Sequence, residues 1–532
     1  MRTRFSMLAL FAVLLVSACS QTESSEERPN ILFVMTDDHA FQAISAYGSN
    51  LIETPNIDRL AEEGMLFERA FVSNSICSPS RAAIITGKHS HLNSVRNNRD
   101  VFDSTQVTLP KLLREAGYHT AVVGKWHLKS QPTGFDYWKV LPGQGYYYQP
   151  EFRTPEGVVT EEGYVTDVIT DLAIGYLDSL RNESKPFMLM YQHKAPHREW
   201  WPSMQDLEEF KDREIPQPET LFDDYENRGT AAKDDEMRIY DHMGLTNDNK
   251  IRPEVVERLG YEEFLGWYEY AYTSNYDRLT EEEKEKWNEV YGPINEEFEE
   301  NTPKGQALTL WKYQRYLEDY LGTIRSVDRN LGRIMEYLEE NGLAENTMII
   351  YTSDQGFYLG EHGWFDKRFM YEESFRTPLI IKYPGVIEPG SRNRELVQNI
   401  DFAPTMLEAA RAEIPDDIQG RSLVPLFENT QEGWRDGLYY HYYEYPGIHM
   451  VKRHYGIRTD RYKLIHFYYD VDEWELYDLQ EDPMELNNLY DDPAYAEVQE
   501  RLHDELERLR DFYGDSRELD QMFLERDLGA EE

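Results

Sequence analysis

The chain has few cysteines, few basic residues relative to acidic ones, and no long apolar segment beyond its N-terminus. Only two cysteines occur among 532 residues, which excludes a disulfide framework, and no paired Cys/His spacing indicates a zinc site. The 55 Lys and Arg residues against 99 Asp and Glu residues give a formal net charge of −44. Such a surface would repel a polyanion, so nucleic acid is not an expected partner.

The first cysteine, Cys19, ends a segment typical of protein export. Two arginines in residues 1–4 precede an apolar run over residues 5–16 that is short for a bilayer span. Because this pattern resembles a bacterial lipoprotein signal, we expect residues 1–18 to be a signal peptide, Cys19 to carry lipid, and residues 19–28 to form a polar tether. An ordinary secretory signal with an incidental cysteine is the alternative. The expected location is the bacterial cell envelope, at the periplasmic or outer-membrane surface, with the lipid as the only membrane anchor.

Four short apolar runs are each followed by polar residues suited to a site. They are residues 30–35 before Asp37, Asp38 and His39; residues 120–123 before Lys125 and His127; residues 187–191 before His193, Lys194 and His197; and residues 347–351 before Asp354 and Gln355. Buried parallel strands form such continuous apolar runs, and ligands of open α/β sheets bind beyond the carboxyl ends of the strands. The sequence therefore predicts an α/β domain with these side chains at one edge of its sheet.

Composition divides the rest of the chain. We expect an N-terminal α/β domain over residues 29–430, interrupted by an acidic, mostly helical insertion at about 203–305 that either walls one side of the site or is a solvated excursion. Apolar residues at helical spacing predict a long packed helix over residues 308–338. Residues 431–532 contain short alternating strands and a terminal amphipathic helix, which predict a small antiparallel α+β subdomain.

The second cysteine, Cys77, precedes Pro79 and a stretch of small residues that can start a helix. The backbone N–H groups and dipole of a helix N-terminus favour negative charge, which suits an anionic substrate. Arg81 would lie one turn along and could hold the same anion. A single cysteine in a loop is more often an inert buried thiol, so its neighbours carry the argument.

The run Cys77-Ser78-Pro79-Ser80-Arg81, followed by Thr86-Gly87, resembles the signature of type I sulfatases, in which the cysteine is converted to formylglycine. Four further motifs support the resemblance in the family's order: Asp37-Asp38, Gly124-Lys125-Trp126-His127, Asp354-Gln355-Gly356, and Gly360-Glu361-His362-Gly363-Trp364-Phe365-Asp366-Lys367. The resemblance extends from about residue 28 into the C-terminal region. It implies the alkaline-phosphatase-superfamily sulfatase fold, with a large mixed α/β domain and a smaller C-terminal α+β domain containing an antiparallel sheet.

The resemblance also implies one Ca²⁺ ion, held by Asp37, Asp38, Asp354 and Gln355 and contacted by the modified Cys77. The oxygen ligands agree with this assignment, because hard oxygen donors suit Ca²⁺ better than zinc or copper. A carboxylate pair is often only a solvated turn, but Asp37 and Asp38 follow a buried run. Gln355 departs from the commoner Asn and offers the same amide oxygen on a longer side chain.

In the implied mechanism, one hydroxyl of the hydrated formylglycine attacks sulfur in line with the departing sugar oxygen, and the second hydroxyl then expels sulfate. By the same resemblance, Arg81, Lys125 and Lys367 neutralise the sulfate oxygens. His127 assists the formylglycine hydroxyls, and His197 protonates the departing alkoxide. A formylglycine-generating or equivalent maturase is the implied partner.

Residues 192–198 and 141–145 look similar to bacterial carbohydrate sulfatases of the N-acetylglucosamine-6-sulfatase kind. This implies hydrolysis of O-sulfate esters on a sulfated glycan, with the 6-O-sulfate of N-acetylglucosamine as first choice. His193 and Lys194 are candidate substrate contacts, although a structural hydrogen-bonding role fits each equally well. Because a surface at −44 repels a long polyanion, we expect chain ends or oligosaccharides to enter a local cationic pocket.

Three alternatives stay open. The enzyme could act on another sulfated polysaccharide, such as an algal one. A phosphatase or phosphodiesterase of the same superfamily would be expected to carry a Ser or Thr nucleophile and a fuller Asp/His set for two metals. A non-catalytic, lipid-anchored glycan-binding protein would keep Cys77 unmodified.

Overall fold

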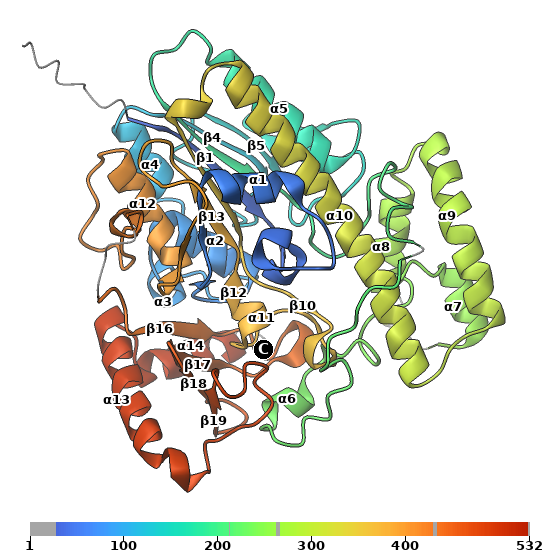
Figure 1. Cartoon of the computed structure of the whole chain (residues 1–532). Coiled ribbons are helices and arrows are strands. Elements are labelled where there is room, and N and C mark those ends of the chain that lie inside the picture. The colour runs from blue at the N-terminus through green and yellow to red at the C-terminus, as the bar shows by residue number, and fades with distance from the viewer. Residues whose placement is uncertain (1–27, 212, 262–265, 429–432, 530–532) are drawn as a thin grey trace, which may run out of the picture.

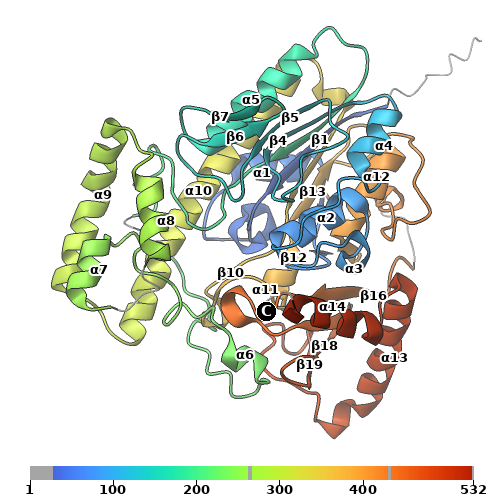
Figure 2. The ribbon, with the colours of Figure 1, turned by 180° about the vertical axis from the view of Figure 1, so that it is seen from behind.

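The computed structural model describes residues 28–211, 213–261, 266–428 and 433–529. The predicted signal peptide (1–18), Cys19 and all but the last residue of the predicted tether lie outside these residues and stay predictions. Figures 1 and 2 show a large layered body, a smaller C-terminal unit packed against it, and a group of helices at one side. Every helix among the described residues is too short or too polar for a membrane span.

A ten-stranded mixed sheet forms the centre of the large body. Its spatial order is β14 (Ser391–Asn393), β2 (Met65–Phe67), β13 (Leu379–Lys382), β9 (Thr347–Ser353), β1 (Asn30–Thr36), β8 (Phe187–Gln192), β4 (His119–Lys125), β5 (Tyr137–Leu141), β6 (Glu151–Thr154) and β7 (Gly157–Thr160). The neighbours β9, β1, β8, β4 and β5 are parallel to one another. All four predicted apolar runs are therefore strands of one parallel core, which confirms that prediction.

Alternation along β1 shows why this core strand is apolar throughout. Leu32 and Val34 pack in the cluster that contains residues of α1 (Pro55–Glu63), α5 (Val165–Ser179) and α10 (Gln306–Glu340). Ile31, Phe33 and Met35 pack in the cluster with residues of α2 (Cys77–Thr86), α4 (Leu109–Glu115) and α12 (Phe402–Ala409). Successive side chains of a strand point to opposite faces, so a strand with helices on both sides needs apolar residues at every position. The large body is thus a three-layer α/β/α arrangement (Figure 1).

The described residues of this body and its insertion form twelve α-helices. They are α1 (Pro55–Glu63), α2 (Cys77–Thr86), α3 (Ser90–Asn93), α4 (Leu109–Glu115), α5 (Val165–Ser179), α6 (Ala231–Asp234), α7 (Pro253–Leu259), α8 (Trp267–Tyr276), α9 (Glu281–Glu300), α10 (Gln306–Glu340), α11 (Glu372–Phe375) and α12 (Phe402–Ala409). The predicted long helix over 308–338 is confirmed as α10. Its apolar face packs on α1 and α5.

The insertion is less helical than its composition suggests. In its described residues, helices α7, α8 and α9 fill the second half, whereas the first half contains only the four-residue helix α6. The prediction of a mostly helical segment over 203–305 is therefore wrong for its first half. Pro216 and Pro218 cannot continue a helix, and backbone groups there bond to other segments, as Ile215 N does to Gln314 Oε1 at 2.9 Å.

The C-terminal unit contains a four-stranded antiparallel sheet. Its strands are β16 (Gly437–Tyr442), β17 (His454–Thr459), β18 (Tyr462–Phe467) and β19 (Glu473–Asp478), paired in that order. Helix α13 (Ala496–Tyr513) packs on this sheet and is followed by α14 (Arg517–Gly529), which we did not predict. The expected antiparallel sheet is confirmed, while the boundary at residue 430 stays a prediction.

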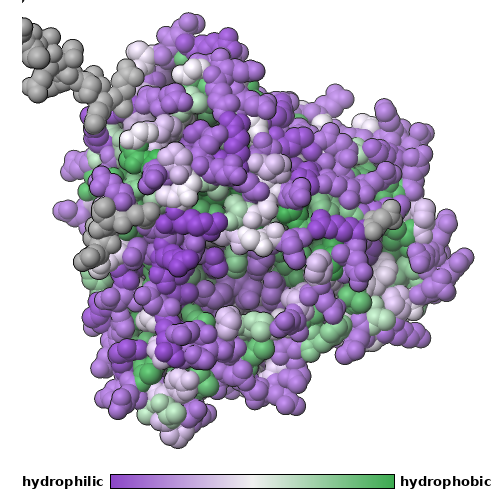
Figure 3. Space-filling view, viewed as in Figure 1, coloured by the Kyte–Doolittle hydropathy of each residue, from purple (hydrophilic) through white to green (hydrophobic). Residues whose placement is uncertain are grey.

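The large body also contains two small sheets. One pairs β3 (Ala70–Phe71) with β12 (Arg376–Thr377) and β15 (Val397–Gln398), and another pairs β10 (Tyr358–Leu359) with β11 (Phe365–Asp366). Phe71 of the large body and Leu438 of the C-terminal unit belong to the same apolar cluster. The face in Figure 3 is predominantly hydrophilic, as a net charge of −44 requires.

Candidate active site

The parallel strands bring their polar carboxyl-terminal residues to one edge of the sheet. Asp37 and Asp38 follow β1, Lys125 ends β4, and Asp354 and Gln355 follow β9. Because β1 pairs directly with β8 and β9, and β8 pairs with β4, these ends are neighbours in space. The predicted gathering of side chains at this edge is what the structure shows.

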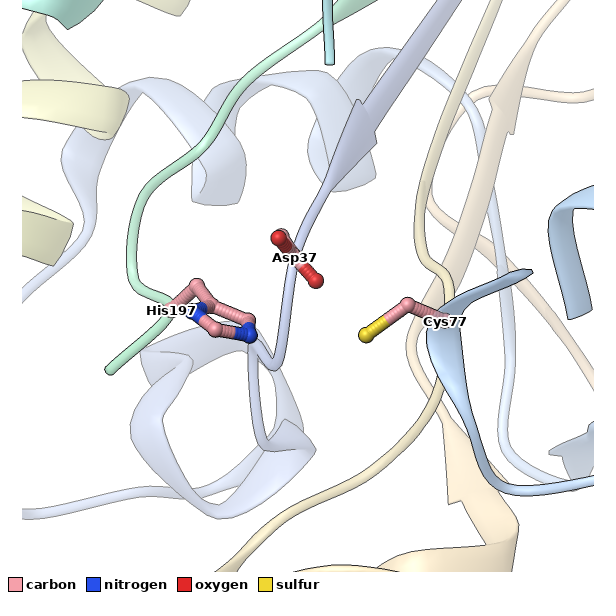
Figure 4. Close-up of side chains that lie close together, drawn as sticks. All are labelled: Asp37, Cys77 and His197. Carbon is pink, nitrogen blue, oxygen red and sulfur yellow. The ribbon is translucent and has the colours of Figure 1, made fainter. Parts of the chain in front are cut away.

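Cys77 is the first residue of α2, and its side chain is buried at this edge. Figure 4 shows it pointing toward Asp37 and His197, and one ligand atom from each of these three residues lies within 4.8 Å of the others. Burial raises the pKa of the Cys77 thiol to about 12, so the unmodified group stays protonated at neutral pH. An unmodified thiol in this state is a weak nucleophile.

Three carboxylates form the centre of the site. Asp37, Asp38 and Asp354 are fully buried and present oxygen atoms within 4.8 Å of one another. Asp37 Oδ1 and Gln355 Oε1 are buried without a hydrogen-bond partner, while Gln355 Nε2 donates to Asp38 Oδ1. Oxygen donors of this kind and number fit a hard divalent cation. The four residues of the predicted Ca²⁺ site are thus brought together.

Each carboxylate has a cationic neighbour. Arg81 donates from Nε to Asp354 Oδ2 at 2.9 Å, Lys125 donates to Asp37, and Lys367 lies 2.5 and 2.7 Å from the two oxygens of Asp38. Burial disfavours the charged form of Lys367, but adjacent Asp38 raises its pKa above the ordinary value. Burial lowers the pKa of Lys125 well below its ordinary value. The three basic residues predicted to bind sulfate are thus gathered at one place, each beside a carboxylate, and their role there stays a prediction.

Two histidines flank this charge cluster. His127 lies beside the start of α2, with Nδ1 3.4 Å from Ser78 Oγ, and His197 Nε2 lies 3.8 Å from Asp38 Oδ2. Burial, followed by the charge of Lys125, lowers the pKa of both imidazoles well below the ordinary value. Both rings are therefore neutral in the protein without substrate.

His193 and Lys194 differ in position, although they are adjacent in sequence. His193 is fully buried against the ring of Tyr191, and neither ring nitrogen has a hydrogen-bond partner. Lys194 lines the cavity next to the site, with Nζ 4.7 Å from the centre of the Tyr147 ring. Burial lowers the pKa of Lys194 to about 8. Lys194 is thus in a position to meet a ligand, and His193 does not line the cavity.

The cavity next to the site has a volume of about 300 Å³ and also contains residues that sequence reasoning missed. Asp366 and Arg368 lie on either side of Lys367, and Asp366 Oδ2 is 3.2 Å from His449 Nε2 of the C-terminal unit. Their adjacency to Lys367 was a usable signal for Asp366 and Arg368. His449 gave none, because the fold alone brings it here. Trp267 and Tyr270 of α8 form another wall, so the insertion borders the site.

Comparison with known proteins identifies the family. A family model described as sulfatase matches residues 29–412, and one described as N-sulphoglucosamine sulphohydrolase, C-terminal, matches residues 360–512. The chain belongs to the sulfatase family. It is thus a sulfuric ester hydrolase, and the predicted enzyme class is confirmed.

Individual relatives agree with this assignment. The N-acetylglucosamine-6-O-sulfatase of Bacteroides thetaiotaomicron is 50% identical over 96% of this chain and 91% of its own length. A Clostridium perfringens arylsulfatase is 28% identical over 92% of this chain and 97% of its own length. A solved structure in complex with its substrate D-glucosamine-2-N,6-O-disulfate matches with a TM-score of 0.88 and 49% identity, covering 92% of this chain and 99% of the other.

A phosphonate monoester hydrolase of Agrobacterium radiobacter shares the fold, with a TM-score of 0.65 and 22% identity over 91% of this chain and 96% of the other. The predicted sulfatase fold of the alkaline-phosphatase superfamily is confirmed by these structures. The roles of the individual site residues stay predictions. What the structure establishes is their position.

Proposed function

We propose that this sulfatase removes the 6-O-sulfate from a terminal N-acetylglucosamine, or a related glucosamine, of a sulfated glycan. The observation that carries the substrate assignment is the relative with 50% identity along nearly the whole chain, which is an N-acetylglucosamine-6-O-sulfatase. The structure with 49% identity, which holds a 6-O-sulfated glucosamine, supports the same choice. The cavity of about 300 Å³ beside the cationic cluster is at the lower limit of ordinary ligand pockets, which suits one sugar residue.

Asp37, Asp38, Asp354 and Gln355 would hold one Ca²⁺ ion, which supplies a Lewis acid for a sulfate oxygen when bound. Conversion of Cys77 to formylglycine supplies, as the hydrate, the hydroxyl that attacks sulfur. The start of α2 fixes this residue at the edge of the sheet.

The remaining groups would bind the sulfate and carry out the proton transfers. Arg81, Lys125 and Lys367 converge on the carboxylates and would share their charge with the sulfate oxygens. His127 stands beside the start of α2 and would assist the nucleophilic hydroxyl. His197 lines the cavity, where the negative charge of a bound sulfate favours its protonated form for transfer to the leaving sugar oxygen.

The N-terminal segment supports a location. We propose that residues 1–18 are removed, that Cys19 receives lipid, and that the enzyme is held at the bacterial cell envelope by this anchor alone. A formylglycine-generating or equivalent maturase is then the partner that acts on Cys77.

The test combines mass analysis with paired substrates. The full chain is produced in a host with a maturase, and the peptide containing Cys77 is weighed. N-acetylglucosamine 6-sulfate and the same sugar 6-phosphate are then assayed side by side. We expect conversion of Cys77 and release of sulfate in large excess over phosphate.

Dominant phosphate release would instead support a phosphatase. An intact Cys77 thiol in fully active enzyme would remove the proposed nucleophile. Galactose 6-sulfate serves as the sugar control, and a higher kcat/KM for it would contradict the amino-sugar assignment.

A further inference from the structure

A second cavity opens beside the active-site pocket. It has a volume of about 640 Å³ and shares Arg198, Trp267, Ile448 and His449 with the active-site pocket. Its other walls come from residues 236–245 of the insertion, from the first turns of α10, and from α8. These four residues form the border between the two cavities, and two of them, Trp267 and Ile448, are 49% and 64% exposed. The border is therefore open to solvent, and a ligand longer than one sugar residue can lie across it.

The second cavity offers aromatic surface. Tyr240 and Trp267 are 46% and 49% exposed, although both line a concavity. Ile448, at the shared wall, is 64% exposed. Large apolar side chains left exposed in a cavity mark ligand-binding surfaces, and the flat face of an aromatic ring packs well on the C–H face of a pyranose.

The charges around this cavity indicate which sugars it takes. The Arg198 guanidinium is paired with Asp248 through two contacts, at 2.5 and 2.7 Å, and Lys312 Nζ donates to the backbone oxygens of Tyr240 and Met243. Glu236 and Asp241 are exposed at the same cavity, and Asp241 Oδ2 also lies 3.6 Å from Arg238 Nε. The cations are thus engaged within the protein, and a uronate or sulfated residue would meet two carboxylates.

We propose that the second cavity binds an uncharged hexose residue linked to the sulfated terminal amino sugar. This inference rests on the proposed function, because the first cavity must hold the sulfated residue. It explains how an acidic enzyme accepts part of a sulfated chain: the anionic group enters the cationic cluster, while the neighbouring residue contacts an aromatic and weakly acidic wall.

Tyr240→Ala tests the aromatic contact, because Tyr240 lines the second cavity and not the first. The measurement is kcat/KM for the 6-sulfated monosaccharide and for a disaccharide in which this residue is linked to galactose. The disaccharide-to-monosaccharide ratio should fall by about 10-fold, as expected when one aromatic anchor is lost from a binding surface. Phe512→Ala, which removes an exposed aromatic ring of α13, is the matched control and should leave the ratio unchanged.

The charge argument has its own test. The wild-type enzyme should prefer the galactose disaccharide over one whose second residue is a glucuronate. Glu236→Gln combined with Asp241→Asn should raise relative activity on the uronate disaccharide several-fold. A wild-type preference for the uronate would overturn the assignment of an uncharged residue.

Failure of this inference is distinguishable from failure of the proposed function. If the monosaccharide is hydrolysed and Tyr240→Ala leaves the ratio unchanged, the second cavity does not bind the neighbouring sugar and the proposed function stands. If neither the 6-sulfated monosaccharide nor the galactose disaccharide is hydrolysed, the proposed function fails. Calorimetric binding of the galactose disaccharide to Cys77→Ser, with and without Tyr240→Ala, then decides the inference, and equal affinities overturn it.

Discussion

The two ends of the active site are built differently. At the sulfate end, Lys125 and the three carboxylates lie at strand ends of the central sheet, Arg81 lies in α2, and Lys367 follows β11. All of these side chains are buried. At the sugar end, the walls come from α8 of the insertion and from residues 448–449 of the C-terminal unit, with several large side chains exposed. The chemistry is therefore tied to the scaffold, whereas sugar recognition depends on segments that surround it.

This difference has an energetic side. A buried charge that loses its partner carries a large desolvation cost, so the sulfate end tolerates few changes. Exposed aromatic side chains at the sugar end are already in contact with water. Replacing one of them should therefore change substrate binding more than it changes the free energy of unfolding.

The largest effect should come from breaking the sulfate end at Lys367. Lys367→Met removes the cation that lies 2.5 Å from Asp38 and, in the proposed mechanism, a contact to the sulfate. We expect kcat to fall by about 10²–10³-fold, the loss typical of one transition-state charge contact. The assay is kcat on N-acetylglucosamine 6-sulfate.

A matched control separates catalysis from folding. Lys463 of the C-terminal unit is also buried, and it ion-pairs with Glu485 of the same unit and with Glu372 of α11. Lys463→Met should lower Tm while the folded enzyme keeps its kcat. If both variants reduced kcat equally, the loss at Lys367 would reflect stability alone and the comparison of the two ends would fail.

An intermediate effect is expected at Gln355, within the same end. Gln355→Asn keeps an amide oxygen and should raise the Ca²⁺ concentration for half-maximal activity only slightly. Gln355→Ala removes this donor and should raise it by about 10–100-fold, as loss of a supporting metal contact does. The measurement is recovery of activity as Ca²⁺ is added back after chelation. An unchanged Ca²⁺ requirement in Gln355→Ala would show that the side chain is no ligand.

The sulfate end was predictable from sequence because buried parallel strands have a continuous apolar signal and deliver the next residues to one edge. The positions of Asp37, Lys125 and Asp354 followed from that pattern, and the five family motifs pointed to Cys77 as the proposed nucleophile. The sugar end was not predictable from the sequence, because the contact of His449 with Asp366 depends on how the C-terminal unit packs on the large body. A contact between residues so far apart in the chain leaves no periodic pattern in the sequence.

The insertion shows a second limit of sequence reasoning. Its acidic composition suggested a mostly helical segment, but composition does not report where backbone groups find hydrogen-bond partners. Asn249 Nδ2, for example, donates to the backbone oxygen of Lys312 in α10 at 3.1 Å, so tertiary contacts hold this segment without regular structure. Only the second half followed its local signals, since α9 begins at a capping box formed by Thr280 and Glu283.

The smallest effect should come from that capping box, far from the sulfate end. Thr280 Oγ1 accepts from Glu283 N at 3.3 Å, and Glu283 Oε2 accepts from Thr280 N at 2.7 Å. Thr280→Ala should lower the free energy of unfolding by about 1 kcal/mol, while Thr280→Ser keeps the cap and should match wild type. Urea unfolding measures the first quantity, and kcat/KM on the monosaccharide should stay within about twofold because neither cavity contains α9. A tenfold loss of kcat/KM in Thr280→Ala would mean that the insertion supports the chemistry directly, and the division between a scaffold-bound sulfate end and a separable sugar end would not hold.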